Sequence, residues 1–196
     1  MTWLDSDPKG KITGETFAPY ALFHRGSLWQ RHVRIIDDTS SDLRVLDVIA
    51  ALISFYEPLI IVEAGTYRGI GAICMAETLR TCDVPGHVWT CDPVDYGVEE
   101  ILREVDLTER VTYVKGGLEQ LLPMLPAPLN FAYIDASAPN QGDLRARYVS
   151  LALQHAAPGA LVLVDDVASE WPNSLELRTF ANVCLMAKRG LAIFQK

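Results

Sequence analysis

Apolar positions change between a helical and a strand-like spacing several times after residue 40. Residues 43–53 carry apolar side chains three and four positions apart, after the capping residues Ser40-Ser41-Asp42 and before Pro58. Later apolar runs are short and bounded by glycine, proline or aspartate, which is typical of buried strands. They predict strands at residues 59–62, 87–91, 111–114, 129–134 and 160–164, with helices at residues 70–79 and 98–107, a short one ending at residue 122, and one at residues 142–156 that Pro158-Gly159 closes.

Five strands that alternate with helices predict a mostly parallel sheet with helices on both faces. Residues 182–186 and 191–195 are two further apolar runs around Ala187-Lys188-Arg189-Gly190, which indicates a terminal antiparallel hairpin. The expected fold is therefore α/β, a Rossmann-like, doubly wound, seven-stranded sheet. Residues 1–38 show no sustained period beyond a candidate helix near residues 18–34, so we divide the chain into this N-terminal segment and a domain at residues 39–196.

Composition narrows the class of protein. The chain has 196 residues, enough for one domain, and a net charge of −8. Its longest basic cluster, Arg31-His32-Val33-Arg34, is followed by two aspartates, so no basic stripe indicates nucleic-acid binding. The most apolar stretch, residues 45–62, contains Asp47, Glu57 and Pro58, which argues against a membrane span.

Cysteine usage and the first residues indicate a cytoplasmic protein. The four cysteines, Cys74, Cys82, Cys91 and Cys184, form no CxxC pair and are expected to be reduced, buried thiols. The first fifteen residues lack the apolar core of a signal peptide.

Acidic residues stand at the ends of four predicted strands. They are Glu63, Asp92, Asp135 and the pair Asp165-Asp166, while Gly116-Gly117 ends the remaining strand. In open α/β sheets ligands bind beyond the carboxyl ends of the strands. The sequence therefore predicts a binding site at this edge of the sheet.

The loop after the first strand reads VEAGTYRGIG and places Glu63 two residues before the first of three glycines. Glycine lets a ligand approach the backbone closely. A dinucleotide site has the spacing Gly-x-Gly-x-x-Gly, whereas this loop has Gly-x-x-x-Gly-x-Gly, and Glu63 would repel a pyrophosphate. The loop favours a cationic or zwitterionic ligand.

The segments VEAGTYRG, TCDP, VTYVKGGLEQLLP, FAYIDAS and GALVLVDDV occur in this order over residues 59–167. In these segments the chain resembles class I S-adenosylmethionine-dependent methyltransferases. The resemblance is strongest to the small metal-dependent O-methyltransferases and to the related branch that acts on sugars and natural products. It implies the family's reversed last strand, in agreement with the predicted hairpin.

The resemblance also implies roles for individual residues. Glu63 would anchor the cationic methionine end of the cofactor, and Asp92 would accept hydrogen bonds from both ribose hydroxyls. Gly117 and Leu118 would flank the adenine. The full implied cofactor set is Glu63, Ala64, Gly65, Thr66, Tyr67, Gly69, Asp92, Gly117, Leu118 and Asp135. The chain departs from the family at Ile70-Gly71, where Gly-Ser is common, and at Gly117, where Asp or Ser is common.

In the metal-dependent members, aspartates end the fourth and fifth strands. Asp135, Asp165 and Asp166 would then bind Mg²⁺ or Mn²⁺, because carboxylate oxygens suit hard cations, and Asp135 would be catalytic. In the alternative, Asp135 only contacts the cofactor and Asp165-Asp166 cap a loop.

A general base is harder to assign from the sequence. Related enzymes often carry Lys or His near the fourth-strand aspartate, where this chain has Ser137-Ala138-Pro139-Asn140. His24 and His32 are candidate bases, whereas His87 and His155 are expected to be packing residues. Tyr20, Phe23 and Trp29 could form a lid over the acceptor, although core packing explains them equally well, and Trp171 could line the acceptor pocket.

The expected function is methyl transfer from S-adenosylmethionine to a hydroxyl of a small molecule, with help from a divalent cation. An NAD(P)-dependent oxidoreductase is one alternative, although the glycine order and the lack of a Tyr-x-x-x-Lys motif disfavour it. A domain that binds the cofactor without catalysis is the other. Related small enzymes often pair through their N-terminal segments, so a homodimer is possible, with residues 1–38 as a lid or dimer contact.

Overall fold

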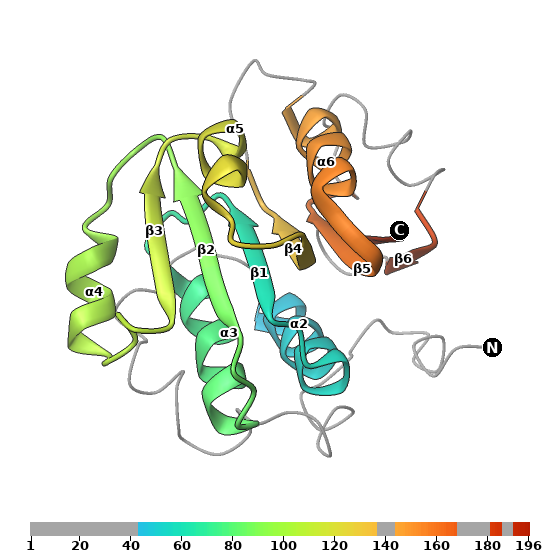
Figure 1. Ribbon diagram of the computed structural model, residues 1–196. Coiled ribbons are helices and arrows are strands. Elements are labelled where there is room, and N and C mark those ends of the chain that lie inside the picture. Colours follow the sequence, from blue (N-terminus) through green and yellow to red (C-terminus); the bar gives the residue numbers. More distant parts are fainter. Residues whose placement is uncertain (1–42, 137–143, 168–180, 186–189) are drawn as a thin grey trace.

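The computed structural model describes residues 43–136, 144–167, 181–185 and 190–196 (Figure 1). The predicted helix near residues 18–34, the aromatic lid residues, His24, His32, residues 137–140 and Trp171 lie outside the described residues. The helices are α2 Leu43–Tyr56, α3 Ile70–Thr81, α4 Val98–Glu104, α5 Leu118–Leu121, the 3₁₀ helix η3 Leu122–Met124 and α6 Leu144–His155. The strands are β1 Ile60–Ala64, β2 His87–Asp92, β3 Val111–Lys115, β4 Leu129–Ile134, β5 Ala156–Asp165, β6 Val183–Leu185 and β7 Leu191–Gln195.

The seven strands form one sheet in the order β3-β2-β1-β4-β5-β7-β6. Strands β1 to β5 run parallel to one another, and β7 runs antiparallel to both β5 and β6. The order reverses between β1 and β4, so a crevice is expected beyond the carboxyl ends of these two strands. The predicted doubly wound sheet with a C-terminal antiparallel hairpin is confirmed.

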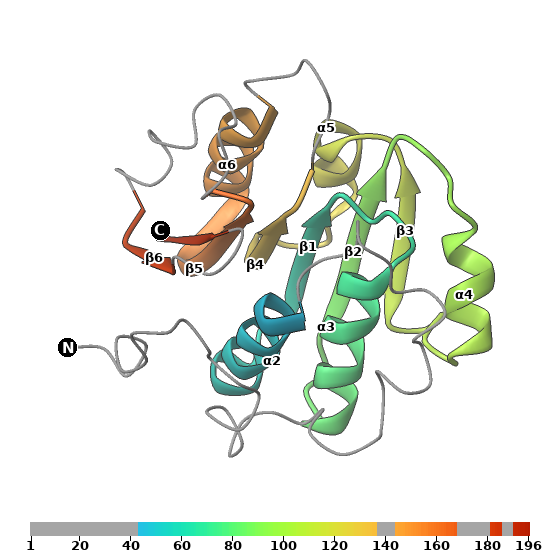
Figure 2. The ribbon, with the colours of Figure 1, turned by 180° about the vertical axis from the view of Figure 1, so that it is seen from behind.

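Helices cover both faces of the sheet (Figures 1 and 2). Along β1, Ile61 packs in the apolar cluster that contains α2, α3 and α4, and Val62 packs in the cluster that contains α5 and α6. The same alternation on the other strands follows from the two-residue period of a β-strand. The sheet therefore separates two cores, and every strand-end side chain has a defined face.

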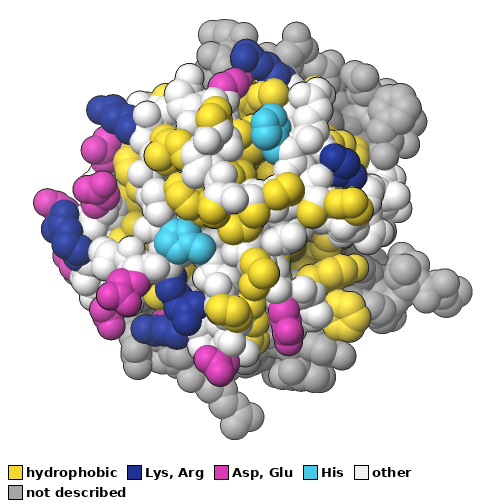
Figure 3. Space-filling view, in the orientation of Figure 1, with side chains coloured by type: hydrophobic (Ala, Val, Ile, Leu, Met, Phe, Trp, Pro, Cys, Tyr) yellow, Lys and Arg dark blue, Asp and Glu magenta, His cyan; other side chains and the backbone are white. Residues whose placement is uncertain are grey.

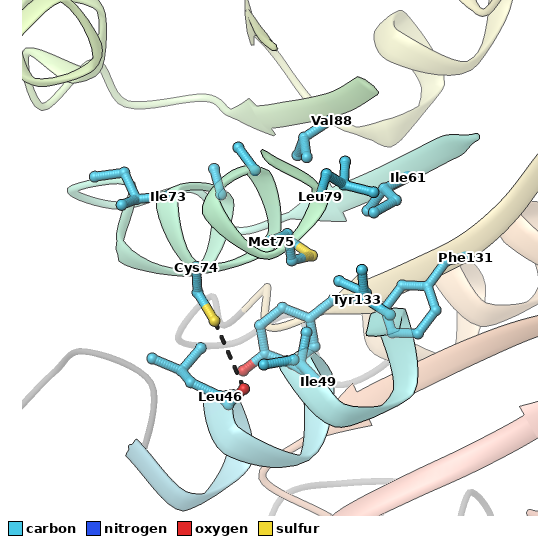
Figure 4. Packing of buried hydrophobic residues seen from close by; sticks show 14 of the residues in the cluster. Leu46, Ile49, Ile61, Ile73, Cys74, Met75, Leu79, Val88, Phe131 and Tyr133 are labelled. Atoms are coloured by element: carbon cyan, nitrogen blue, oxygen red, sulfur yellow. Dashed lines mark hydrogen bonds between the residues drawn. The ribbon is translucent and has the colours of Figure 1, made fainter. Parts of the chain in front are cut away.

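Buried apolar side chains pack closely in the core between the sheet and helices α2 and α3 (Figure 4). Leu46, Ile49, Met75 and Phe131 are each 0% exposed, and a buried side chain of this size stabilises the fold by about 1.5–3 kcal/mol. The thiol of Cys74 donates a hydrogen bond to the carbonyl oxygen of Leu46 at 3.6 Å. Cys74, Cys82 and Cys91 are free thiols, of which Cys74 and Cys91 are buried as predicted and Cys82 is only half-buried; the side chain of Cys184 is not described.

Strand β5 begins earlier than the sequence predicts. Helix α6 ends at His155 and the strand starts at Ala156, so Pro158-Gly159 lies inside the strand and does not close the helix. The pairing with β4 shifts here, from Leu129 opposite Ala156 to Phe131 opposite Leu161. Gly159 has a φ of 82°, which is accessible to glycine, so the extra residues form an irregularity within the strand.

Candidate functional site

The loop between β1 and α3 lies against the carboxyl ends of β2 and β4. The backbone N–H groups of Gly65 and Thr66 donate to the carbonyl of Cys91 at 2.9 and 3.2 Å. The N–H of Asp135 donates to the carbonyl of Ala64 at 2.9 Å. Gly65 (φ 102°) and Gly69 (φ 85°) have left-handed backbones, and Gly69 begins α3. The predicted glycine loop thus holds three strand ends together.

Glu63 lies in a buried polar row that crosses three strands. The register places Thr90 of β2 and Tyr133 of β4 directly opposite Glu63, and all three residues are at most 1% exposed. The hydroxyl of Thr90 donates to Glu63 Oε2, and the hydroxyls of Thr66 and Thr90 are in contact. A Cβ on Gly71 would come within 2.0 Å of Glu63 Oε1, so the glycine at this position provides the space for the carboxylate.

The environment of Glu63 favours its neutral form. Burial raises the pKa of Glu63 to about 8, the hydrogen bond from Thr90 opposes this rise, and the nearby carboxylates of Asp135 and Asp92 add to it. The carboxyl group is therefore mostly protonated at neutral pH in the ligand-free protein. A cation bound nearby would favour its ionised form.

Asp92 is held in a fixed orientation by the backbone. Its Oδ2 accepts the N–H of Tyr67 at 3.0 Å and its Oδ1 accepts the N–H of Val94 at 2.9 Å. Tyr67 has a φ of 46°, and its ring meets that of Tyr96 edge to face with centroids 4.7 Å apart. Each carboxylate oxygen keeps acceptor capacity for a ligand hydroxyl.

We expect Asp92→Asn to weaken S-adenosylhomocysteine binding about tenfold or more. An amide has only one acceptor oxygen, so it must give up one of the two backbone donors at Tyr67 and Val94, and the ligand loses a charged acceptor. Calorimetric titration measures this change. Asp95→Asn is the matched control, because Asp95 lies in the same loop and accepts the N–H of Gly97, not those of Tyr67 and Val94. Equal affinities of the Asp92 variant and the parent would contradict the assigned role.

The β3–α5 connection is shaped by a tyrosine from α6. Gly117 has an extended backbone, and a Cβ there would come within 2.5 Å of the Tyr148 hydroxyl. Burial raises the pKa of the Tyr148 phenol, and the nearby backbone of Leu118 opposes this rise. The Gly117 N–H donates to Gln120 Oε1 at 2.8 Å. Tyr148 therefore occupies the space that Asp or Ser would take at residue 117.

Tyr133 connects the aspartates that end β4 and β5. Its hydroxyl lies 2.8 Å from Asp165 Oδ2 and 3.3 Å from Asp135 Oδ2. Asp165 is 0% exposed, and its other oxygen accepts the N–H of Asp166 at 2.8 Å. Asp135 is half-buried at the edge of the sheet, so it is the more accessible of the two carboxylates.

The structure does not assemble the metal site predicted from Asp135, Asp165 and Asp166. Asp165 bonds to Tyr133 on the α2–α3 face, whereas Asp166 Oδ2 accepts from Arg145 Nη2 of α6, at 3.0 Å, on the other face. Among residues 43–136, 144–167, 181–185 and 190–196, no group of three His, Cys, Asp or Glu side chains is placed to hold a metal ion. The alternative expectation, in which Asp165-Asp166 cap a loop, agrees better with these contacts.

Sequence reasoning missed four residues that shape the site: Thr90, Tyr133, Arg145 and Tyr148. Tyr133 precedes Asp135 by two residues, and Thr90 precedes Asp92 by two, so strand alternation could have placed each pair on one side of its strand. Arg145 and Tyr148 lie on α6, and nothing in the local sequence indicates that they reach the strand ends.

Of the two histidines expected to pack, His87 is half-buried beside Thr112, and His155 is exposed on α6, so the second expectation was wrong.

A profile of the protein family described as a methyltransferase domain matches residues 62–167, more than half of the chain. No curated protein matches the chain. Among solved structures, the fold is similar to the O-methyltransferase TomG of tomaymycin synthesis from Streptomyces achromogenes, in complex with S-adenosylmethionine, with a TM-score of 0.63, 19% identity and coverage of 84% of this chain and 85% of that one.

Two further solved structures are similar over nearly their whole length. The O-methyltransferase from Bacillus cereus, in complex with S-adenosylhomocysteine, has a TM-score of 0.70 at 17% identity and covers 92% of this chain and 98% of its own. The methyltransferase PaMTH1 from Podospora anserina, also bound to S-adenosylhomocysteine, has a TM-score of 0.70 at 17% identity, with 97% and 98% covered. At these identities the likeness concerns the fold.

Proposed function

The chain belongs to the methyltransferase-domain family, and from this membership we propose that it transfers the methyl group of S-adenosylmethionine to a hydroxyl oxygen of a small molecule. The observation that carries the proposal is the glycine loop after β1, with Glu63 buried at its base and Asp92 fixed beside it. The expectation of an oxygen acceptor is supported by the O-methyltransferases among the similar solved structures.

The residues at the strand ends suit this cofactor, which supplies an electrophilic methyl group on a sulfonium. Gly65 and Gly69 permit a close backbone approach, and Glu63 offers an acidic group to the cationic end. The oriented carboxylate of Asp92 would accept the ribose hydroxyls. At the adenine end, Tyr148 would supply the hydroxyl that a Ser at residue 117 supplies elsewhere.

Asp135 would accept the proton of the acceptor hydroxyl. Its side chain is half-buried at the carboxyl end of β4, and the Tyr133 hydroxyl on the core side limits its movement. As the proton passes to the Asp135 carboxylate, the acceptor oxygen forms the bond to the methyl carbon and the electron pair of the broken S–C bond stays on sulfur. Asp135 thereby fills the role for which the sequence offered no Lys or His.

The proposed acceptor is a small molecule, and a homodimer and a cytoplasmic location remain predictions. The part of the chain that the structure describes contains no helix long and apolar enough to cross a membrane. On the face shown in Figure 3, basic side chains lie among acidic ones along the α4 edge. This arrangement, with the net charge of −8, supports a small acceptor over a nucleic acid.

The proposal is tested by calorimetry with S-adenosylmethionine, S-adenosylhomocysteine and NAD, followed by turnover on a panel of catechols and sugars. We expect binding of the two sulfur compounds but not of NAD. We expect Asp135→Asn to lower turnover about 100-fold, within the usual contribution of a general base, while S-adenosylhomocysteine affinity changes less than threefold.

Each alternative function has its own result in these assays. Binding of NAD in place of the sulfur compounds would favour the oxidoreductase. Cofactor binding without turnover of any acceptor would favour a non-catalytic domain. Full turnover by the Asp135 variant would remove the general-base assignment but keep the methyl transfer.

A further inference from the structure

The three aspartates at the ends of β4 and β5 are already engaged by the protein. Asp165 uses one oxygen for the Tyr133 hydroxyl, at 2.8 Å, and the other for the Asp166 N–H, also at 2.8 Å. Asp135 shares the Tyr133 hydroxyl at 3.3 Å. Both contacts of Asp165 are fully enclosed, since this residue is 0% exposed.

Asp166 points to the opposite side of the sheet from Asp165. Its φ of 62° turns the chain away from the strand direction, and its Oδ2 meets Nη2 of Arg145 at 3.0 Å. The two side chains are only 10% (Arg145) and 16% (Asp166) exposed. Arginine stays protonated at all relevant pH values, so this is a fixed positive charge within the acidic strand ends.

From these contacts we infer that Arg145 takes the place of the divalent cation at these strand ends, so that the protein neither binds nor requires a metal there. The inference that methyl transfer requires no metal rests on the proposed function. The inference that no metal binds at these strand ends does not. The guanidinium neutralises one carboxylate, and the Tyr133 hydroxyl and the Asp166 N–H satisfy the oxygens of a second.

A divalent cation would have to break this arrangement to bind. Mg²⁺ takes close to octahedral oxygen coordination at about 2.0–2.1 Å, so its ligands must converge on one point. Asp165 and Asp166 would both have to turn, which would break the contact of Asp165 with the Tyr133 hydroxyl and the buried ion pair of Asp166 with Arg145. Removing one partner of a buried charge pair is strongly destabilising. A divalent cation can therefore bind here only if the Arg145–Asp166 ion pair breaks.

The first experiment uses the unaltered full chain with S-adenosylhomocysteine. Mn²⁺ is titrated and its free concentration is followed by electron paramagnetic resonance. We expect the signal to equal that of buffer up to millimolar Mn²⁺. A saturable site that Asp166→Asn abolishes would overturn the inference, whether or not the protein methylates any acceptor.

The second experiment compares three variants. Arg145→Gln removes the positive charge that faces Asp166, so we expect Mn²⁺ to bind at least tenfold more tightly than to the parent and to raise the Tm of this variant alone. The double variant Arg145→Gln/Asp166→Asn is the matched control and should lose both responses. Arg145→Lys, which keeps the charge, should behave as the parent. An Arg145→Gln protein that binds Mn²⁺ no better than the parent would overturn the inference.

Turnover with and without EDTA completes the test. Once an acceptor is known, we expect EDTA to change the rate of the parent less than twofold. A rate that falls more than tenfold with EDTA and returns with Mg²⁺ would overturn the inference while supporting methyl transfer. Absence of cofactor binding would overturn the proposed function, and the Mn²⁺ results would still decide the metal site.

Discussion

Replacing Glu63 by Gln is expected to weaken S-adenosylmethionine binding about ten- to 100-fold at pH 8.5. The loss corresponds to one charge-assisted contact of about 1.5–3 kcal/mol. Glu63 is 1% exposed at the base of the glycine loop, and Gln has nearly the same shape. The substitution therefore removes the negative charge without creating a cavity. Isothermal titration measures the affinity of both proteins.

The pH dependence follows from the raised pKa. The pKa of Glu63 rises from 4.5 to about 8 on folding because the carboxyl group is buried. Between these two values the folded protein holds one more proton than the unfolded chain. The contribution of Glu63 to the free energy of unfolding is therefore fully present below pH 4.5. It is lost as the pH rises to about 8, by up to about 1.4 kcal/mol per pH unit. Glutamine has no proton to lose, so the Glu63→Gln protein should lack this slope.

Two measurements separate binding from stability at Glu63. The Tm of Glu63→Gln relative to the parent should rise by about 5 °C between pH 6 and 8, from the size-dependent relation of Tm to free energy. The affinity of the parent for S-adenosylmethionine should increase over the same pH range, because a larger fraction of Glu63 is already ionised and binding releases fewer protons. Glu77→Gln, at a second buried glutamate on α3, is the matched control for the binding measurement and should leave the affinity unchanged. Equal, pH-independent affinities of the parent and Glu63→Gln would contradict an anchoring role.

Much of the fold follows from the sequence because its elements have clear periods. Strands β1 to β4 and helices α2, α3 and α4 appear within a few residues of their expected positions, and the hairpin of β6 and β7 was predicted from two apolar runs. The start of β5 was wrong because Pro158-Gly159 looks like a helix end, whereas pairing with β4 continues across an irregularity there. Tertiary pairing therefore decided this boundary against the local turn signal.

The candidate site could be predicted only as far as strand ends could be located. The sequence places Glu63, Asp92 and Asp135 at one edge of the sheet, and the structure agrees. Whether an acid is charged or paired depends on partners from other elements, such as Thr90 beside Glu63 and Arg145 beside Asp166. The local sequence could not show that Arg145 faces Asp166, so the metal site predicted at Asp135, Asp165 and Asp166 stays a prediction, which the Mn²⁺ titration tests.

Gly65→Ala is expected to destabilise the protein by about 2–5 kcal/mol and to lower its Tm by roughly 10 °C. Gly65 has a φ of 102°, which costs an L-residue about 1–2 kcal/mol. The new Cβ would also lie 2.6 Å from the Asp135 carbonyl oxygen and 2.9 Å from the Ala136 nitrogen. These are backbone atoms, so the end of β4 must move, at a further cost of about 1–3 kcal/mol.

Gly97→Ala separates the two causes of this loss. Gly97 also has a left-handed backbone, with a φ of 76°, but no atom of the residues that the structure describes lies within 4 Å of its potential Cβ. We expect this variant to lose only about 1 kcal/mol and to bind S-adenosylhomocysteine as the parent does. Gly65→Ala should additionally lower that affinity, because the Asp135 N–H bond to Ala64 fixes the β4 end against the loop. If the two variants unfold at the same temperature, the close approach of Gly65 to the β4 end contributes nothing to the fold, and the loop is not the rigid base that cofactor binding requires.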